Sequence, residues 1–253
     1  MTQPSGTHHD NAIRTGCAGW SLPRASWALF PPDGSHLERY AAVFNAVEIN
    51  SSFYRPHQAA TYARWAQSVP ADFRFAVKMP KAITHVQRLG ESNALLDDFL
   101  AQACGLGAKL GCVLTQLPPS LKFDADIAGR FLQSLRERYA GPVAMEPRHA
   151  SWFTPEAEAL LASFKVARVL ADPVLHDGGE RPGGHAGLVY LRLHGSPRVY
   201  YSAYEKPVLD ALAVRLHESA AAGAAVWCVF DNTAAGAAVE NALYTRAPTV
   251  RKD

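Results

Sequence analysis

The sequence predicts an α/β protein of one domain, a (β/α)8 TIM barrel with eight parallel strands. Eight short apolar runs alternate with seven stretches of helical periodicity or composition, which is typical of a parallel sheet. The repeat of roughly 30 residues suits the strand–helix unit of a closed barrel. A chain of 253 residues with 48% hydrophobic residues also has the size that such barrels commonly have.

The predicted strands are rich in apolar and β-branched residues, and they cover residues 13–20, 46–53, 73–80, 110–118, 142–149, 166–173, 188–195 and 225–232. The predicted helices follow from spaced apolar positions, and they cover residues 36–44, 59–69, 95–107, 126–139, 155–164, 208–223 and 234–244. We expect a disordered N-terminus over residues 1–12, the barrel domain over 13–247 and a C-terminal tail over 248–253.

The crossover between the sixth and seventh strands breaks this pattern. Residues 172–187, DPVLHDGGERPGGHAG, are rich in Gly, Pro and charge and have no helical periodicity. This predicts an irregular sixth crossover, a long loop that could act as a lid. Residues 194–207 form a second long segment with three tyrosines, and both segments should lie over the same mouth of the barrel.

Composition limits the partners and the cellular location. The chain has 25 Lys and Arg against 23 Asp and Glu, a net charge of +2, so any site for an anionic partner must be local. Four cysteines without a CxxC pair predict buried, reduced thiols: Cys17, Cys104, Cys112 and Cys228. The first dozen residues lack the features of a signal peptide, and no apolar run reaches about 18 residues. We therefore expect a cytoplasmic protein with no membrane partner.

Polar residues at the strand ends give the strongest functional signal. Side chains alternate between the two faces of a strand, so in a barrel the apolar parity faces the helices and the other parity points inward. This rule predicts inward polar groups at the carboxyl ends of strands two to eight: Glu48, Asn50, Lys78, Gln116, Glu146, Asp172, Arg192, His194 and Asp231. Barrel enzymes build their sites at that end. The alternative is that these groups are polar layers of the interior or helix caps.

The predicted mouth is basic and aromatic, although the whole chain is nearly neutral. Cations around a cleft bind phosphate or carboxylate groups, and aromatic faces stack on a base or a sugar. We therefore expect an anionic small molecule or nucleic acid as partner. The candidate substrate-binding residues are Asn50, Tyr54, Arg55, Lys78, Gln116, Arg148, His149, Trp152, Arg192, Tyr201 and Asn232. The alternative is that several of the aromatics only stabilise the core or the loops.

Acid–base and metal chemistry both remain open at this stage. The candidate catalytic residues are Glu48, Glu146, His194 and Asp231. A divalent metal ion could be held by residues at the ends of strands five to eight: Glu146, Asp172, His194 and Asp231. The sequence has no HxH, HExxH or CxxC metal motif, no GxSxG nucleophile and no GxGxxG turn, so zinc clusters, serine hydrolases and nicotinamide cofactors are not indicated.

Seven blocks of the sequence resemble the DUF72 family, the YecE-like proteins: GCAGWS, FNAVEINSSFYRP, RFAVKMPKAITH, VLTQLPPS, MEPRHASW, YLRLHGSPRVYYSAY and FDNTAAGAAVENAL. They cover nearly the whole chain in the right order. The resemblance implies a single-domain TIM barrel whose reaction is not established. The family usually ends the eighth strand with two asparagines, whereas this chain has Asp231 and Asn232, so a role for an uncharged amide does not carry over to the first of these positions.

Three hypotheses follow. The leading one is an enzyme that acts on a phosphorylated or nucleic-acid-like anion by hydrolysis or another acid–base step, with or without a metal. In it, Glu48 or Glu146 is the general base or a metal ligand, and His194 shuttles a proton. Lys78, Arg148 and Arg192 hold the anion. The second is a non-catalytic module that binds nucleotide or nucleic acid, and the third is a sugar or sugar-phosphate isomerase or epimerase.

Overall fold

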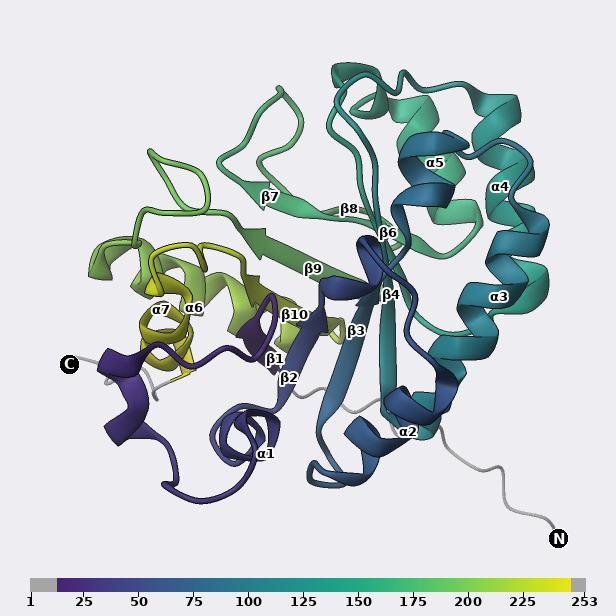
Figure 1. The fold of residues 1–253 in the computed structure, drawn as a ribbon. Helices are drawn as coiled ribbons and strands as arrows, with labels where there is room; N and C mark the ends of the chain where they lie inside the picture. The colour runs from purple at the N-terminus through teal and green to yellow at the C-terminus, as the bar shows by residue number, and fades with distance from the viewer. Residues whose placement is uncertain (1–12, 247–253) are drawn as a thin grey trace, which may run out of the picture.

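The computed structural model describes residues 13–246, which form a mixed α/β fold of mostly parallel strands flanked by helices (Figure 1). The strands are β1 (Ile13–Cys17), β2 (Ala46–Ile49), β3 (Arg74–Lys78), β4 (Leu110–Gln116), β5 (Val143–Glu146), β6 (Val166–Arg168), β7 (Leu170–Asp172), β8 (Gly183–Gly184), β9 (Leu188–Leu193) and β10 (Ala225–Phe230). The helices are α1 (His36–Ala41), α2 (Ala59–Gln67), α3 (Asn93–Ala103), α4 (Ala125–Arg138), α5 (Pro155–Ser163), α6 (Lys206–Ala221) and α7 (Ala237–Arg246). The predictions for residues 1–12 and 247–253 lie outside the described residues.

The strands pair as two sheets. One has the order β1-β10-β9-β7 and is parallel throughout; the other has the order β2-β3-β4-β5-β6-β8 and is parallel except for β8. The sheets meet at two places. Only Val169 separates β6 from β7, and its N–H donates to the carbonyl of Met145 at 2.8 Å. Ala18, just after β1, forms a parallel bridge with Glu48 of β2. The predicted α/β class with parallel strands is confirmed.

Each of the seven predicted helical stretches contains an α-helix, and three begin at a capping side chain. The Ser35 hydroxyl accepts a hydrogen bond from the N–H of Glu38, whose carboxylate accepts one from the Ser35 N–H. Asp124 and Thr154 cap α4 and α5 in the same way, each accepting from the N–H three residues on. Helices α3, α4 and α5 lie together on one flank of the strands, and α6 and α7 on the other (Figure 1).

The sixth crossover is irregular, as predicted, and contains only the short strand β8. Two side chains hold it against the core. The Arg168 guanidinium donates to the carbonyls of Gly178 and Arg181 and forms an ion pair with Glu158, which also accepts from the N–H of Gly184. Because Arg168 is almost fully buried, this segment is anchored from beneath along much of its length.

Both sheets contribute to one inner hydrophobic cluster, in which small residues from β2, β3, β5 and β6 face large ones from β9 and β10. Tyr190 and Trp227 stack there with ring centroids 5.8 Å apart. Gly111 leaves room for them, because a Cβ on it would lie 2.6 Å from Trp227 Cζ2. This cluster fills the interior beneath the polar residues at the strand ends. Three of the four cysteines are buried free thiols as expected, but Cys104, at the end of α3, is exposed.

Candidate functional site

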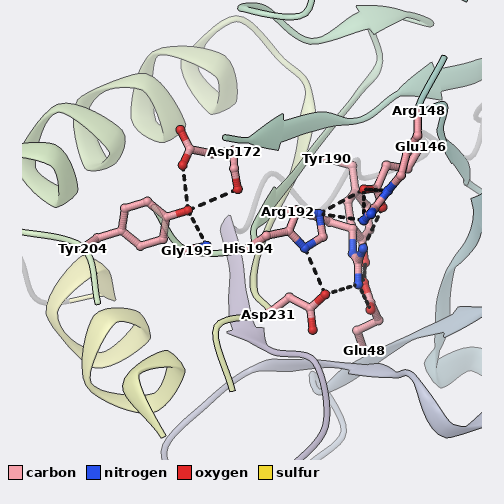
Figure 2. A network of polar contacts seen from close by, with 10 residues as sticks. All are labelled: Glu48, Glu146, Arg148, Asp172, Tyr190, Arg192, His194, Gly195, Tyr204 and Asp231. Atoms are coloured by element: carbon pink, nitrogen blue, oxygen red, sulfur yellow. Dashed lines mark hydrogen bonds and ion pairs between the residues drawn. The ribbon is translucent and has the colours of Figure 1, made fainter. Parts of the chain in front are cut away.

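The centre of the site is the guanidinium of Arg192, near the end of β9, which is fully buried among three carboxylates (Figure 2). It binds Glu48 through two hydrogen bonds, from Nε at 3.0 Å and Nη2 at 2.8 Å. It also donates to Glu146 at 2.6 Å and to Asp231 at 2.9 Å. Glu48 has no exposed surface and also accepts a hydrogen bond from the Tyr190 hydroxyl. A cation removed from water in this way is stabilised only by such close partners.

His194 follows Arg192 by two residues and lies between two of the same carboxylates (Figure 2). Its Nδ1 is 3.0 Å from Asp231 Oδ2, and its Nε2 is 2.9 Å from Glu146 Oε1. Since carboxylates only accept, both ring nitrogens donate, and the ring is an imidazolium. Burial lowers the pKa of His194, but Glu146 and Asp231 outweigh it, so the pKa is raised above its usual value. The site therefore keeps His194 charged.

Arg148, two residues after β5, supplies a third cation. Its Nε and Nη2 donate to Glu146 Oε1 at 3.2 and 2.9 Å, so that this oxygen is shared with His194. Burial lowers the pKa of Arg148, but Glu146 and the nearby Tyr200 outweigh this effect and raise the pKa above its usual value. For Glu146 and Asp231, burial acts in the opposite direction and raises the pKa. Arg192 and His194 outweigh burial and hold the pKa values of both carboxylates below their usual values. Both carboxylates are ionised at neutral pH.

Lys78, at the end of β3, is a fourth cation near the network, but it is not one of its hydrogen-bonded residues. Its side chain is 5% exposed, and its ammonium lies 4.3 Å from the centre of the Phe53 ring. No carboxylate among the described residues forms a salt bridge with it. Burial lowers its pKa to about 8, and Arg192 adds to this effect. Three carboxylates face the cations of Arg148, Arg192 and His194, so Lys78 brings a fourth positive charge to the strand ends.

Further cations lie near Lys78. His85 is half-buried, and its ring stacks edge-on against Phe53. Burial lowers the pKa of His85, and Lys78, Lys81 and Arg148 lower it further. A histidine that resists protonation next to a lysine with a depressed pKa indicates a place where an anion would be stabilised.

The comparisons with known proteins agree with this architecture. A family model described as protein of unknown function DUF72 matches residues 14–250. The chain belongs to the DUF72 family. It is 30% identical to the UPF0759 protein YecE of Escherichia coli K12 over 147 residues, which are 58% of this chain and about half (52%) of that protein. It is 24% identical to the UPF0759 protein YunF of Bacillus subtilis over 90% of this chain and 92% of that protein.

Two solved DUF72 structures share the fold. A DUF72 family protein of Enterococcus faecalis V583 has a TM-score of 0.78 at 22% identity, covering 92% of this chain and 94% of its own. One from Thermotoga maritima has a TM-score of 0.74 at 26% identity, covering 92% and 97%. None of these DUF72 relatives carries a name that states a reaction or a substrate, so the chemistry must be inferred from the site itself.

The site of this DUF72 chain brings together all the predicted catalytic residues and part of the predicted binding residues. The four predicted catalytic residues and two of the predicted substrate-binding residues form one hydrogen-bonded network: Glu48, Glu146, His194, Asp231, Arg148 and Arg192. Lys78 interacts electrostatically with this network. Gln116 is buried at the end of β4, where it pairs in register with Glu146, and the buried Oδ1 of Asn50 finds no hydrogen-bond partner among residues 13–246.

Asp172 corrects the sequence interpretation. It was expected to point inward with the other strand ends, but Ala167 and Val169 belong to the inner cluster while Leu170 packs in the outer core. Asp172 shares the parity of Leu170, and its carboxylate accepts a hydrogen bond at 2.7 Å from Tyr204 (Figure 2). On this outer face, residues of α6 lie near Leu170 and Asp172, and the carboxylate is accommodated because the Tyr204 hydroxyl donates to it.

Other predicted binding residues have different roles. Trp152 is buried and donates to the Leu121 carbonyl, and Asn232 is buried and bonded to Ser202 and Asn241, so neither offers a face to a ligand. His149 caps its own short turn by accepting from the Ser151 N–H. The remaining three are exposed on loops: Tyr54, Arg55 and Tyr201.

The predicted metal set is not assembled. Within residues 13–246, no three His, Cys, Asp or Glu side chains are grouped so as to hold a metal ion. Asp172 is on the outer face, and the other three candidates are joined by the cations of Arg192 and Arg148. The residues present therefore do not fit a resident divalent ion, and the charges of the carboxylates are offset by protein cations instead.

The sequence interpretation missed several residues around the site. Tyr190 has the inward parity of Arg192 and could have been found by the same alternation rule. Phe53 and Tyr200 were not among the predicted site residues, and their contacts with Lys78 and His194 depend on loop conformations that alternation does not predict.

We also find that no helix in the described part of the chain is long and apolar enough to cross a membrane.

Proposed function

We propose that this DUF72 chain is an enzyme that acts on a small phosphate ester by acid–base catalysis at the carboxyl ends of its strands. The observation that carries the proposal is the ammonium of Lys78, whose side chain is almost fully buried and forms no salt bridge within residues 13–246, although the neighbouring cations of Arg148, Arg192 and His194 are all paired. A buried, unpaired cation is costly, and an anionic substrate would offset that cost.

Three side chains have properties that suit separate roles in the proposed catalysis. Arg148 reaches the surface more than the other network residues do, and it is suited to hold phosphoryl oxygens. Asp231 uses only Oδ2 in the network, so Oδ1 is free to orient a water molecule. Asp231 raises the pKa of Lys78, and Lys78 lowers the pKa of Asp231, so the two groups interact electrostatically.

The proposed reaction is hydrolysis of the ester. Water adds to phosphorus as the bond to the ester oxygen breaks, Asp231 accepts a proton from the water, and Lys78 donates one to the leaving oxygen. A general acid works best when its pKa lies near the working pH, and a pKa of about 8 meets that condition. Glu48, Glu146 and His194 act by positioning Arg192, Arg148 and Asp231, since their polar atoms are engaged in the network.

Turnover of phosphate esters tests the proposal. Purified protein is incubated with a panel of phosphomonoesters, phosphodiesters, sugar phosphates and short oligonucleotides, and products are followed by ³¹P NMR. We expect Asp231→Asn to lower kcat at least about 100-fold while KM changes little, and Lys78→Met to lower kcat and raise KM. Lys122→Met, an exposed lysine, is the matched control and should leave both unchanged. Full turnover by both site variants would refute the proposal.

A non-catalytic nucleic-acid-binding module is the alternative that the same panel detects. It would bind oligonucleotides more tightly than small esters, lose that affinity steeply as salt is added, and release no product. Isomerisation of a sugar phosphate without loss of its phosphate would instead favour the third hypothesis.

We also propose that residues 13–247 form a single, closed (β/α)8 barrel. Two links between the sheets support this: the Ala18 bridge to Glu48, extended by a hydrogen bond of 2.8 Å from the Gly19 N–H to the Glu48 carbonyl, and the near-continuity of β6 with β7. Protection of the Gly19 amide from hydrogen exchange, comparable to that of the strand amides, is expected, and fast exchange would contradict closure.

A further inference from the structure

A cleft lies beside the charged network, and its walls are mostly apolar. They are formed chiefly by residues that follow β5, lie between β6 and β7 or in β7, or come from the two long loops: Phe153, Val169, Ala171, Val174, Leu175 and Val199. Glu146, Arg148 and His194 of the network also line the cleft. An apolar compartment that ends at charged groups is typical of a site for a ligand with one apolar and one ionic part.

The rim of this cleft exposes large apolar side chains to water. Leu175 is 58% exposed, Val174 40% and Val199 37%, and all three lie on the loops next to Arg148. Apolar groups that gather at a concave site gain free energy when a ligand covers them. Sugar hydroxyls would find few partners against these walls, so a bare sugar suits the cleft poorly.

Contacts of partly buried side chains with the buried Arg168 hold the cleft in shape. The His176 ring nitrogen Nε2 lies 3.1 Å from the Arg148 carbonyl, which ties the sixth crossover to the residue that borders the network. The Phe153 ring is held between His176, at 5.5 Å between ring centroids, and the guanidinium of Arg168, at 4.8 Å. Since Arg168 also anchors Gly178 through its carbonyl, the aromatic wall and the rim are positioned by the same buried side chain.

We propose that this cleft is a subsite for the aromatic ring of the substrate, which makes aryl phosphates the preferred class of ester. The inference rests on the proposed function, because the phosphate is assigned to Arg148 and Lys78. The ring lies against the exposed side chains of Val174 and Leu175 at the rim, next to Phe153.

Binding of two matched esters tests the proposal. Phenyl phosphate and methyl phosphate carry the same charge and differ in the group that would enter the cleft. By isothermal titration calorimetry, we expect phenyl phosphate to bind at least about tenfold more tightly, because the ring is removed from water. Leu175→Ser should abolish most of this preference and leave methyl phosphate binding unchanged. Leu29→Ser is the matched control, since Leu29 is 56% exposed on the Arg24–Leu29 turn, outside the cleft.

The possible outcomes separate the two proposals. Equal affinity for both esters, with Lys78→Met weakening both, overturns the ring subsite and leaves the phosphate site standing. A preference for phenyl phosphate that Leu175→Ser does not reduce also overturns the subsite. If neither ester binds to the wild-type protein, the proposed function and the subsite fail together. Because Leu175 is exposed, the variant should fold, and an unchanged melting temperature verifies this.

Discussion

Replacing Arg192 by Met removes the cation at the centre of the network, and the structure gives the size of the effect. Arg192 donates four hydrogen bonds to three carboxylates, and the side chains of Glu48 and Glu146 are almost completely removed from water. Met fills a similar volume but leaves these charges uncompensated. Breaking a buried ion pair from one side costs about 3–5 kcal/mol. In a domain of this size, that corresponds to a fall in Tm of roughly 6–20 °C.

The loss should depend on pH in a definite direction. In the wild-type protein, Arg192 helps to hold the pKa values of Glu146 and Asp231 below 4.5 and 3.8, their ordinary values. Their contribution to stability is therefore present above those ordinary values and is lost as the pH falls through the lower folded values. Without Arg192, burial favours the protonated carboxyls instead. The difference between wild type and variant should be largest near pH 7 and should shrink as the pH approaches 4.5.

Urea unfolding, followed by the fluorescence of the five tryptophans, measures this difference at each pH. Arg24→Met, at an exposed arginine, is the control and should change the free energy of unfolding by less than about 0.5 kcal/mol. A loss below about 1 kcal/mol for Arg192→Met, or a loss that is the same at pH 4.5 and pH 7, would refute the view that Arg192 balances three ionised carboxylates.

Three further predictions concern the support of the site. Tyr204→Phe removes the hydroxyl that donates to Asp172, and it should lower the free energy of unfolding by about 1–3 kcal/mol in urea denaturation. His194→Asn should destabilise the protein most below pH 6.5, since a raised histidine pKa stabilises the fold there and the effect is lost as the pH rises through the folded value. Gly111→Ala should cost about 1–3 kcal/mol, because the new Cβ would lie 2.6 Å from Trp227 Cζ2.

Each of these has an outcome that would count against it. A Tyr204→Phe variant as stable as wild type would mean that solvent replaces the lost hydroxyl. Destabilisation of His194→Asn that grows with rising pH would mean that the native ring is neutral. A Gly111→Ala variant without loss of stability would show that the inner cluster has room to move.

Much of the site could be predicted because strand alternation is a simple geometric rule. Glu48, Lys78 and Arg192 each lie between apolar residues of the opposite parity, and Asp231 follows the apolar Phe230, so the face on which they lie follows from the sequence. The partners do not follow in the same way. The distances between strands far apart in the chain determine which carboxylate oxygens Arg192 binds. They also determine that both ring nitrogens of His194 form hydrogen bonds.

The errors have physical causes as well. Asp172 was assigned to the wrong face because a carboxylate is not expected on the outer parity, and the sequence does not show that the Tyr204 hydroxyl donates to it there. Trp152 was expected at the mouth, but its buried indole N–H bonds to a backbone carbonyl in the core. The apolar cleft had no signal in the sequence, since Val174 and Leu175 belong to an irregular loop without periodicity.

The titration of Lys78 tests the central claim most directly. The claim is that the Lys78 ammonium, which forms no salt bridge within residues 13–246, binds an anionic substrate. Protein labelled with ¹³C-lysine is titrated by NMR, and the Lys78 Cε signal is assigned by its loss in Lys78→Met. The account predicts a pKa of about 8 in the free protein and a clear rise when methyl phosphate is added, since a bound anion favours the charged amine. A pKa near the ordinary value of 10.5 that does not change with methyl phosphate would contradict it.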